Sequence, residues 1–263
     1  MTPFNNKLIQ RTVLFIGSFA IAYNIAIAFH ELGHVVAYLI VDEPIIEFVL
    51  NPFSWSWSTG NNFNIFVLWG GVTFGQFFAL LPLLLIFKIK STLFVFLSKL
   101  LAACAFLVNG IYLSLGAIWD FGDGGSLVYL GINTSIIIII GSIYFLISFL
   151  LWSDLQYHLG LNKQTSLINR MTIIVGSIAP YMILIIIYNL VHNSDQIIMW
   201  TGLAVFGILT AFLIAFFGNL WTRMFKYQPT KIVSLNDSWK IFSFGLLIVI
   251  AEFIIFGTPP NPF

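Results

Sequence analysis

Residues 12–41 read TVLFIGSFAIAYNIAIAFHELGHVVAYLIV, a long apolar run whose only charged side chain is Glu31. A helix needs about 20 consecutive apolar residues to cross a bilayer, so this stretch predicts a membrane-spanning helix. The same stretch contains His30 and His34, two of the 4 histidines in the chain. The segment that predicts a membrane protein therefore also carries side chains that can bind a metal ion.

The whole chain has the same apolar character. Its 263 residues are 59% hydrophobic and 8% charged, whereas a soluble domain carries about 25% charged residues. This composition excludes a soluble globular enzyme and a disordered chain. The net charge of +1 lacks the basic excess that nucleic-acid binding requires. The single cysteine, Cys104, excludes an intrachain disulfide and a cysteine-based zinc cluster.

Further apolar runs follow the first one along the chain. Long continuous runs are typical of membrane-spanning helices, whereas a transmembrane barrel would show alternating segments of about ten residues. We therefore predict an all-α, multi-pass integral membrane protein with a single polytopic domain over residues 1–263. About seven spans are expected, at residues 12–41, 64–87, 92–118, 132–152, 171–191, 197–217 and 241–256.

Basic residues predict the orientation of these spans. Cytoplasmic loops carry an excess of Lys and Arg, and the segments 42–63, 119–131 and 192–196 contain neither residue. With seven spans and a cytoplasmic N-terminus, every basic residue except Lys99 falls in a cytoplasmic segment or at its edge. Lys99 lies inside the third run and can extend its amine toward the same side. This orientation depends on the number of spans.

The residues His30-Glu31-Leu32-Gly33-His34 form an H-E-x-x-H motif. Positions i and i+4 share one face of a helix, so the two imidazoles can bind one zinc ion while the glutamate acts on its bound water. Ionisable residues inside an apolar helix are costly and are usually functional. We expect Zn²⁺ as cofactor, His30 and His34 as ligands, and Glu31 as the catalytic base. The alternative is a polar cluster that bonds to a neighbouring helix.

A catalytic zinc ion needs a third protein ligand while one position stays open. The carboxylates that fall neither on the cytoplasmic side nor in solvated outer loops are Asp120, Asp123 and Glu252. We favour Asp123, because the glycines at 122, 124 and 125 permit close backbone approach and a tight turn there. Asp120 and Glu252 remain as alternative ligands.

Taken together, His30-Glu31-Leu32-Gly33-His34 and Asp123-Gly124-Gly125 resemble the motifs of the site-2 protease family of intramembrane zinc metalloproteases. The resemblance implies that Asp123 is the third zinc ligand. It implies a metalloprotease-like core over residues 12–131, with further transmembrane helices over 132–263. The implied activity is hydrolysis of peptide bonds in membrane-embedded or membrane-proximal substrates, with the bilayer and a membrane-bound peptide as partners. The predicted orientation places the active site toward the non-cytoplasmic half.

Two segments bear on substrate binding. Residues 45–58 alternate like two strands, and family members often have a membrane-associated β-hairpin or sheet there, whose free edge pairs with extended substrate. This reading makes Trp55 and Trp57 candidate substrate contacts, and an interfacial aromatic loop is the alternative. The family's second core helix often carries Gly-Pro-x-x-Asn. Here Gly71 and Gly75 predict close helix packing, and Gln76 is the available amide donor.

Two other functions are compatible with this pattern, and a third is disfavoured by the number of histidines. One is a non-catalytic membrane scaffold or transporter derived from such a protease. Another is a zinc protease of the prenyl-protein-processing type, in which a glutamate such as Glu252 is the third ligand. A diiron lipid desaturase or hydroxylase would need many more than the 4 histidines present. Zinc content and cleavage that depends on Glu31 distinguish these classes.

Overall fold

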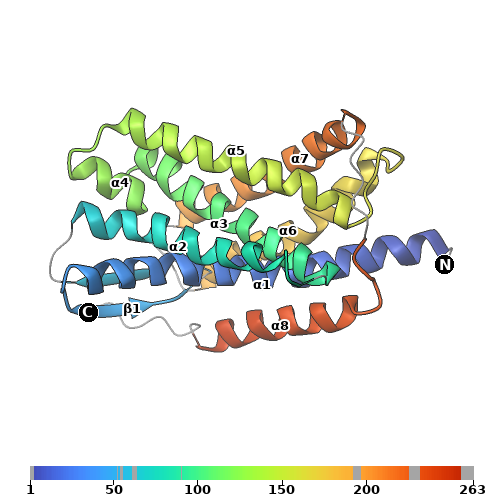
Figure 1. Cartoon of the computed structure of the whole chain (residues 1–263), viewed down its shortest axis with the longest axis horizontal. Coiled ribbons are helices and arrows are strands. Elements are labelled where there is room, and N and C mark those ends of the chain that lie inside the picture. The colour runs from blue at the N-terminus through green and yellow to red at the C-terminus, as the bar shows by residue number, and fades with distance from the viewer. Residues whose placement is uncertain are drawn as a thin grey trace. The chain divides into compact units, whose positions relative to one another are not determined.

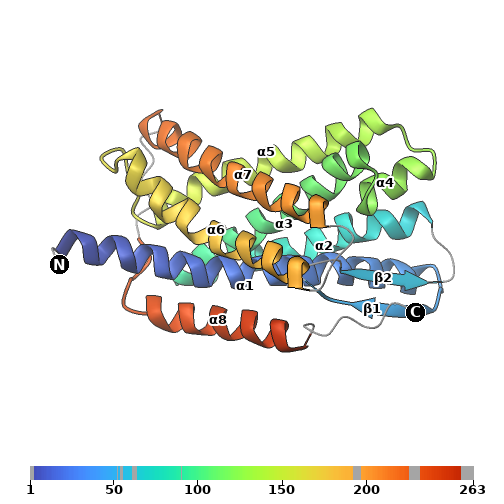
Figure 2. The same cartoon turned by 180° about the vertical axis from the view of Figure 1, so that it is seen from behind.

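The computed structural model describes residues 3–51, 53, 56–60, 64–89, 91–191, 197–224 and 232–255. Within these residues the chain forms mostly helices (Figures 1 and 2), in the order α1 (Pro3–Ile40), β1 (Ile45–Val49), β2 (Trp57–Gly60), α2 (Ile65–Leu85), α3 (Thr92–Trp119), α4 (Gly122–Tyr129), α5 (Thr134–His158), α6 (Leu167–Val191), α7 (Ile197–Met224) and α8 (Ser238–Ile255).

Among the described residues, 6 helices are long and apolar enough to cross a membrane, namely α1, α2, α3, α5, α6 and α7. The prediction of an all-α, multi-pass membrane protein is therefore confirmed at that level. The helix α8 coincides with the seventh predicted span but lies outside this set, so the count of seven stays a prediction. The short helix α4 was not predicted, and it follows α3 almost without a break.

The chain divides into two compact units. We call Ala22–Leu50 with Ser56–Leu151 the motif unit, and Met1–Ile21, Asn51–Trp55 and Trp152–Phe263 the second unit. Both α1 and α5 begin in one unit and end in the other, at residues 21/22 and 151/152. The predicted division of the chain at residue 131 stays a prediction.

In the motif unit, α1 and α2 cross with their backbones in contact. A Cβ atom added at Gly33 would lie 2.7 Å from the Gly75 nitrogen and 2.9 Å from the Gly71 Cα. A Cβ atom at Gly75 would lie 2.7 Å from the His30 Cα. Small residues allow membrane helices to approach this closely, and the crossing lies at the metal-binding motif. The helix α2 begins at Asn64, whose side chain accepts a hydrogen bond from the Val67 backbone nitrogen at 2.9 Å.

The helices α3, α4 and α5 pack together in the same unit. A Cβ atom at Gly124 would lie 2.6 Å from the Ala117 nitrogen, so α4 lies directly against the last turns of α3. A Cβ atom at Gly141 would lie 2.7 Å from the Ser114 nitrogen, which shows that α5 also contacts the α3 backbone. Between these helices and α2 lies a core cluster of apolar side chains, formed by Leu68, Val72, Leu113, Leu127 and Ile137.

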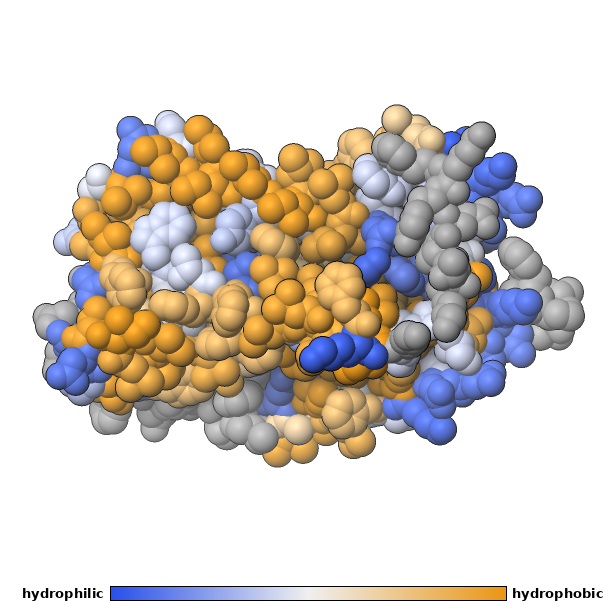
Figure 3. Space-filling model, viewed as in Figure 1, coloured by the Kyte–Doolittle hydropathy of each residue, from blue (hydrophilic) through white to orange (hydrophobic). Residues whose placement is uncertain are grey.

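One side of α5 is apolar and exposed. Large side chains recur there at intervals of three and four residues, at Ile136, Ile139, Ile143, Leu146 and Leu150. Figure 3 shows apolar residues over most of the face along α5, with hydrophilic residues gathered toward helix ends. A continuous exposed apolar stripe on a helix is costly in water and favourable in lipid, so α5 fits a lipid-facing position.

The strands β1 and β2 pair in antiparallel fashion, with Phe48 opposite Ser58 and Val49 opposite Trp57 (Figure 2). The strand β1 lies within the predicted segment 45–58, whereas β2 begins near its end and extends to Gly60. Among the described residues they form a sheet of two strands only, so each strand keeps one unpaired edge. Association of this sheet with a membrane surface stays a prediction.

The second unit has an aromatic core. The buried Trp152 ring lies 5.6 Å from Phe15 and 6.2 Å from Phe19, measured between ring centroids. Phe53, from the segment between the strands, stacks on Tyr181 at 5.5 Å and on Tyr188 at 5.7 Å. The helices α6 and α7 pack side by side (Figure 2).

We expect Gly33→Ala to destabilise the protein, because its methyl group must displace the α2 backbone. Overpacking typically costs about 1–3 kcal/mol in the free energy of unfolding. Gly202→Ala is the matched control, since an added Cβ there meets no atom within 4 Å. Alanine is the better helix former, so the control should unfold at the same or a slightly higher temperature. Thermal unfolding of the purified proteins in detergent measures both. Equal unfolding temperatures for wild type and Gly33→Ala would contradict the close crossing.

Candidate metal centre

The two motif histidines lie on one face of α1 and are buried, with 2% of His30 and 6% of His34 exposed. Their Nε2 atoms are 3.2 Å apart. The spacing of four residues brings the two rings together, as the sequence predicts. The ring of Tyr112 from α3 stands edge-on to His30 at 5.0 Å between centroids and closes one side of the pair.

Asp123 reaches the histidines from the start of α4. The helix α3 ends at Asp120 in a left-handed conformation, with φ of 56°, and Phe121 is extended before α4 begins. This reversal places Asp123 in the first turn of α4, where a carboxylate also interacts favourably with the helix dipole. Its Oδ2 lies 3.0 Å from His30 Nε2, and its Oδ1 lies 3.4 Å from His34 Nε2.

Hydrogen bonds on the far sides of the rings fix which nitrogen of each imidazole carries hydrogen. His34 Nδ1 lies 2.8 Å from the Val67 carbonyl oxygen. A carbonyl oxygen only accepts, so His34 Nδ1 donates, and in the neutral imidazole its Nε2 presents a lone pair. His30 Nδ1 donates in the same way to Asn109 Oδ1 at 2.7 Å. Partners of this kind orient metal-binding histidines in proteins.

With both imidazoles neutral, three lone-pair atoms meet in a buried space without a hydrogen between them. Asp123 Oδ2 accepts no hydrogen bond, although it lies 3.0 Å from His30 Nε2. Such a group of acceptors is repulsive unless a cation lies among them. A tetrahedral zinc ion with bonds of about 2.1 Å holds its ligand atoms roughly 3.4 Å apart. The two Nε2 atoms are 3.2 Å apart, and the nearest Asp123 oxygens lie 3.0 Å from His30 Nε2 (Oδ2) and 3.4 Å from His34 Nε2 (Oδ1), which is close to that spacing.

Glu31 lies next to this group and is also buried, with 2% exposed. Its charge acts on His34 and on Tyr112, so the carboxylate is close to the metal-binding face. Glu31 and Asp123 thus bring two buried carboxylates to the same pair of histidines. A divalent cation neutralises both, which makes the charge of the site consistent with zinc.

Asp123 belongs to α4, outside the six long apolar helices. Burial by itself raises the pKa of the Asp123 carboxyl, but positive charge on His34 and His30 outweighs burial and holds the pKa below its ordinary value. The carboxylate therefore stays ionised whenever a positive charge lies opposite it. A proton on an imidazole or a metal ion can supply that charge, and metal content decides between the two.

Sequence reasoning missed the role of Asn109. This amide lies in the middle of α3 and is 2% exposed. It accepts from His30, and its Nδ2 donates to Gln76 Oε1 at 2.9 Å. The available signal was a lone amide inside an apolar helix, which needs a hydrogen-bond partner. Gln76, predicted as a substrate contact, thus lies behind His30, with its Nε2 buried and without a hydrogen-bond partner among the described residues.

The other predicted residues are placed as follows. Asp120 is exposed at the end of α3, and Glu252 lies on α8 in the second unit. Among the described residues, Asp123 is the carboxylate that meets both histidines, with one ligand atom from each residue within 4.8 Å of the others. Trp55 lies outside the described residues, and Trp57 is described only as part of the backbone of β2.

Gly71 makes room for the two imidazoles. A Cβ atom there would collide with the His34 ring and would lie 2.9 Å from His30 Cε1. The rings therefore occupy the space that a side chain at position 71 would fill. The predicted close packing at Gly71 and Gly75 serves the site directly, because it places α2 against the metal-binding face of α1.

Comparison with models of protein families, with curated proteins and with solved structures found no match to this chain. The assignment of the site therefore rests on its own geometry.

We expect Asp123→Asn to lose bound zinc, because the amide removes the anionic ligand and keeps the size of the side chain. Replacing a residue that hydrogen-bonds to a metal ligand typically lowers metal affinity by about 10–100-fold. Losing the ligand itself should therefore lower zinc affinity by more than about 100-fold. Asp120→Asn is the matched control and should keep full zinc. Elemental analysis of purified, folded protein measures both, together with Glu252→Gln. Full zinc in Asp123→Asn, or its loss in either of the others, would show that another carboxylate binds the metal.

Proposed function

We propose that this protein is a zinc-dependent intramembrane metallopeptidase. The observation that carries the proposal is the convergence of His30 Nε2, His34 Nε2 and the Asp123 carboxylate, all as lone-pair donors, beside the buried Glu31. Three protein ligands leave one position for the reaction, as in catalytic zinc sites. The resemblance of the two motifs to the site-2 protease family supports the same proposal.

Different residues of the chain would have different roles in peptide hydrolysis. A bound zinc ion would polarise the scissile carbonyl and lower the pKa of water. Glu31 accepts the proton from the attacking water and transfers it to the leaving amine. Val67 and Asn109 hold the imidazoles of His34 and His30 in the ligand orientation. Burial of these groups strengthens each electrostatic interaction at the site.

Gln76 supplies a candidate contact for substrate. Its Nε2 is a buried donor that lacks a hydrogen-bond partner among the described residues, while its Oε1 is held by Asn109. A peptide carbonyl of the substrate would satisfy this donor. Transmembrane helices shield their own amides, so the substrate must unwind locally before attack. An unpaired edge of the β1–β2 sheet would suit a segment unwound in this way.

The geometry favours this proposal over its alternatives. A protease of the prenyl-processing type needs a glutamate ligand, but the carboxylate beside His30 and His34 is Asp123. In a non-catalytic scaffold the buried Glu31 beside His30 and His34 would be a cost without a catalytic return. A transporter could use the same carboxylate, so cleavage that depends on Glu31 distinguishes it from the peptidase.

We also propose a cytoplasmic N-terminus with the metal centre toward the non-cytoplasmic half. Each Lys of the connecting segments comes after the second, fourth or sixth of the six long apolar helices. These connections therefore lie on the same side of the membrane as the N-terminus. Lys88 and Lys90 follow α2, Lys163 follows α5, and Lys226 and Lys231 follow α7. The connections after α1 and α3 contain no Lys or Arg. This asymmetry holds for the six helices as well as for seven spans.

We expect Glu31→Gln to keep zinc and to lose cleavage by about 10²–10⁴-fold, the usual contribution of a general base. Glu43→Gln is the control, since Glu43 lies in the turn after α1, outside the zinc ligand group. Fluorescently labelled casein and labelled transmembrane peptides report cleavage, and elemental analysis reports zinc. As a complementary measurement, Glu31→Gln should retain membrane proteins that the wild-type enzyme cleaves and releases. Zinc binding with identical captured proteins and no cleavage by either form would instead identify a scaffold.

The orientation is tested with introduced cysteines, because the single native Cys104 is buried. Thr59 in β2 and Gln164 between α5 and α6 are both exposed. Thr59→Cys should react with an impermeant thiol reagent added to intact cells, whereas Gln164→Cys should react only after permeabilisation. The reverse pattern would overturn the proposed orientation, and the unsubstituted protein controls for reaction at Cys104.

A further inference from the structure

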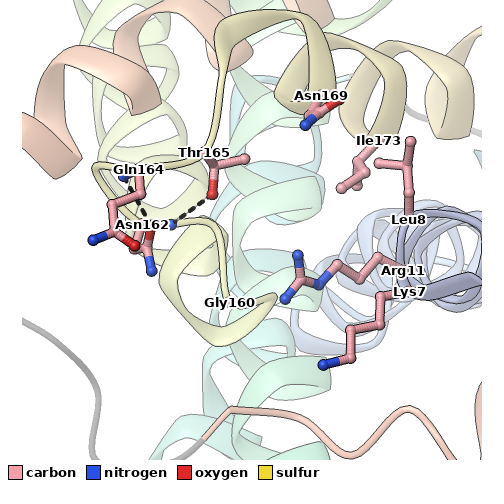
Figure 4. Close-up of a pocket in the computed structure, with 9 residues that line it drawn as sticks. All are labelled: Lys7, Leu8, Arg11, Gly160, Asn162, Gln164, Thr165, Asn169 and Ile173. Carbon is pink, nitrogen blue, oxygen red and sulfur yellow. Dashed lines mark hydrogen bonds between the residues drawn. The ribbon is translucent and has the colours of Figure 1, made fainter. Parts of the chain in front are cut away.

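The second unit contains a polar pocket that the proposed peptidase does not use. It has a volume of about 420 Å³ and is lined by side chains of α1, of the α5–α6 connection and of α6 (Figure 4). Its polar lining residues are Lys7, Arg11, Asn162, Gln164, Thr165 and Asn169. Figure 4 shows Arg11 extending from α1 toward the turn at Gly160, with Asn162, Gln164 and Thr165 on the connection beside it.

The charges of this pocket are unbalanced. Two cations, Lys7 and Arg11, line it, and its lining includes no carboxylate. Neither cation is in an ion pair among the described residues. The Nε of Arg11 is buried and has no hydrogen-bond partner there. A buried guanidinium donor without a partner is costly, and an anion in the pocket would remove that cost.

A third cation lies behind the wall of the pocket. Arg170, at the start of α6, is fully buried, with 0% exposed. Its Nη1 donates to Gln156 Oε1 at 2.8 Å and its Nη2 to Thr222 Oγ1 at 2.8 Å, both neutral acceptors. The same guanidinium donates to the carbonyl oxygens of two lining residues, Asn162 and Thr165. It therefore holds the α5–α6 connection in place and adds positive charge beside the pocket.

The connection itself is ordered by its own side chains. Asn162 Oδ1 accepts from the Gln164 backbone nitrogen at 2.9 Å, and Thr165 Oγ1 accepts from the Asn162 nitrogen at 3.2 Å. Gly160 has φ of +72°, and a Cβ atom there would lie 2.8 Å from Arg11 Nη2. The absence of a side chain at Gly160 thus lets the guanidinium lie over the turn. These features form a defined wall opposite Lys7 and Arg11.

We propose that this pocket binds a phosphate-bearing anion. Arginine and lysine with neutral amide and hydroxyl groups suit phosphate oxygens, and the guanidinium can donate two hydrogen bonds at once. Leu8 and Ile173 add apolar walls near the ends of two long apolar helices, which suits the headgroup of an anionic phospholipid. A soluble phosphate is the other source of the same chemistry. The inference is independent of the metal centre.

The test uses the purified full-length chain in a neutral detergent. Native mass spectrometry counts bound phosphatidylglycerol, with phosphatidylcholine as the uncharged comparison, and thermal unfolding with inorganic phosphate tests the soluble source. The variants are Lys7→Gln, Arg11→Gln and both together. Lys163→Gln is the matched control, because Lys163 is exposed on the same connection but does not line the pocket.

We expect affinity for phosphatidylglycerol to fall about fivefold for each basic residue removed and roughly 25-fold for both. Lys163→Gln should bind like the wild type, and phosphatidylcholine should bind weakly to all forms. Stabilisation by inorganic phosphate that is lost in the same two variants would assign the pocket to a soluble anion and would also support the proposal. Equal loss in Lys163→Gln, or no change in the double variant, would overturn it. If Arg11→Gln does not fold, unchanged binding by Lys7→Gln alone overturns it.

Discussion

Two imidazoles and a carboxylate face one another in the interior of the motif unit. His34 Nδ1 donates to the Val67 carbonyl, His30 Nδ1 donates to Asn109, and Asp123 brings a negative charge. With both rings neutral these groups would repel one another, and a cation among them would remove that cost. The proposed metal ion would account for His30, Glu31 and His34 in an apolar helix and for Asn109 in α3.

The packing of the motif unit brings these groups together. The crossing of α1 and α2 at Gly33 and Gly75 brings the Val67 carbonyl within reach of His34. At the same level Gly71 leaves the space in which both rings lie. The contact of Gly124 with α3 then turns Asp123 toward them. Close backbone contact between helices therefore contributes to the ligand geometry and to stability at once.

Parts of this structure follow from the sequence and other parts do not. Long apolar runs predict the spanning helices, and a spacing of four residues places His30 and His34 on one face, because both depend on local periodicity. The glycines around Asp123 favoured it over Asp120, because residues without a Cβ permit a tight turn and a close backbone approach. The contact between Asn109 and His30 depends on how α3 is rotated, and the division into two units depends on packing between distant segments. Neither leaves a periodic signal in the sequence. The burial of Arg170 by neutral partners is likewise a property of the folded chain.

The left-handed conformation at Asp120 has a consequence for recognising related proteins. A position with φ of 56° favours Gly and, after it, Asn or Asp, so residue 120 could be Gly or Asn without harm to the fold. Three residues later, Asp123 is the proposed metal ligand, and a change to Gly or Asn there would remove the anionic group of the proposed site. A homologue should therefore be sought by an Asp followed by two glycines, together with an amide near the middle of the preceding helix, and not by the first Asp of the pair. A search pattern that requires both acids would miss any relative with Gly or Asn at the first position.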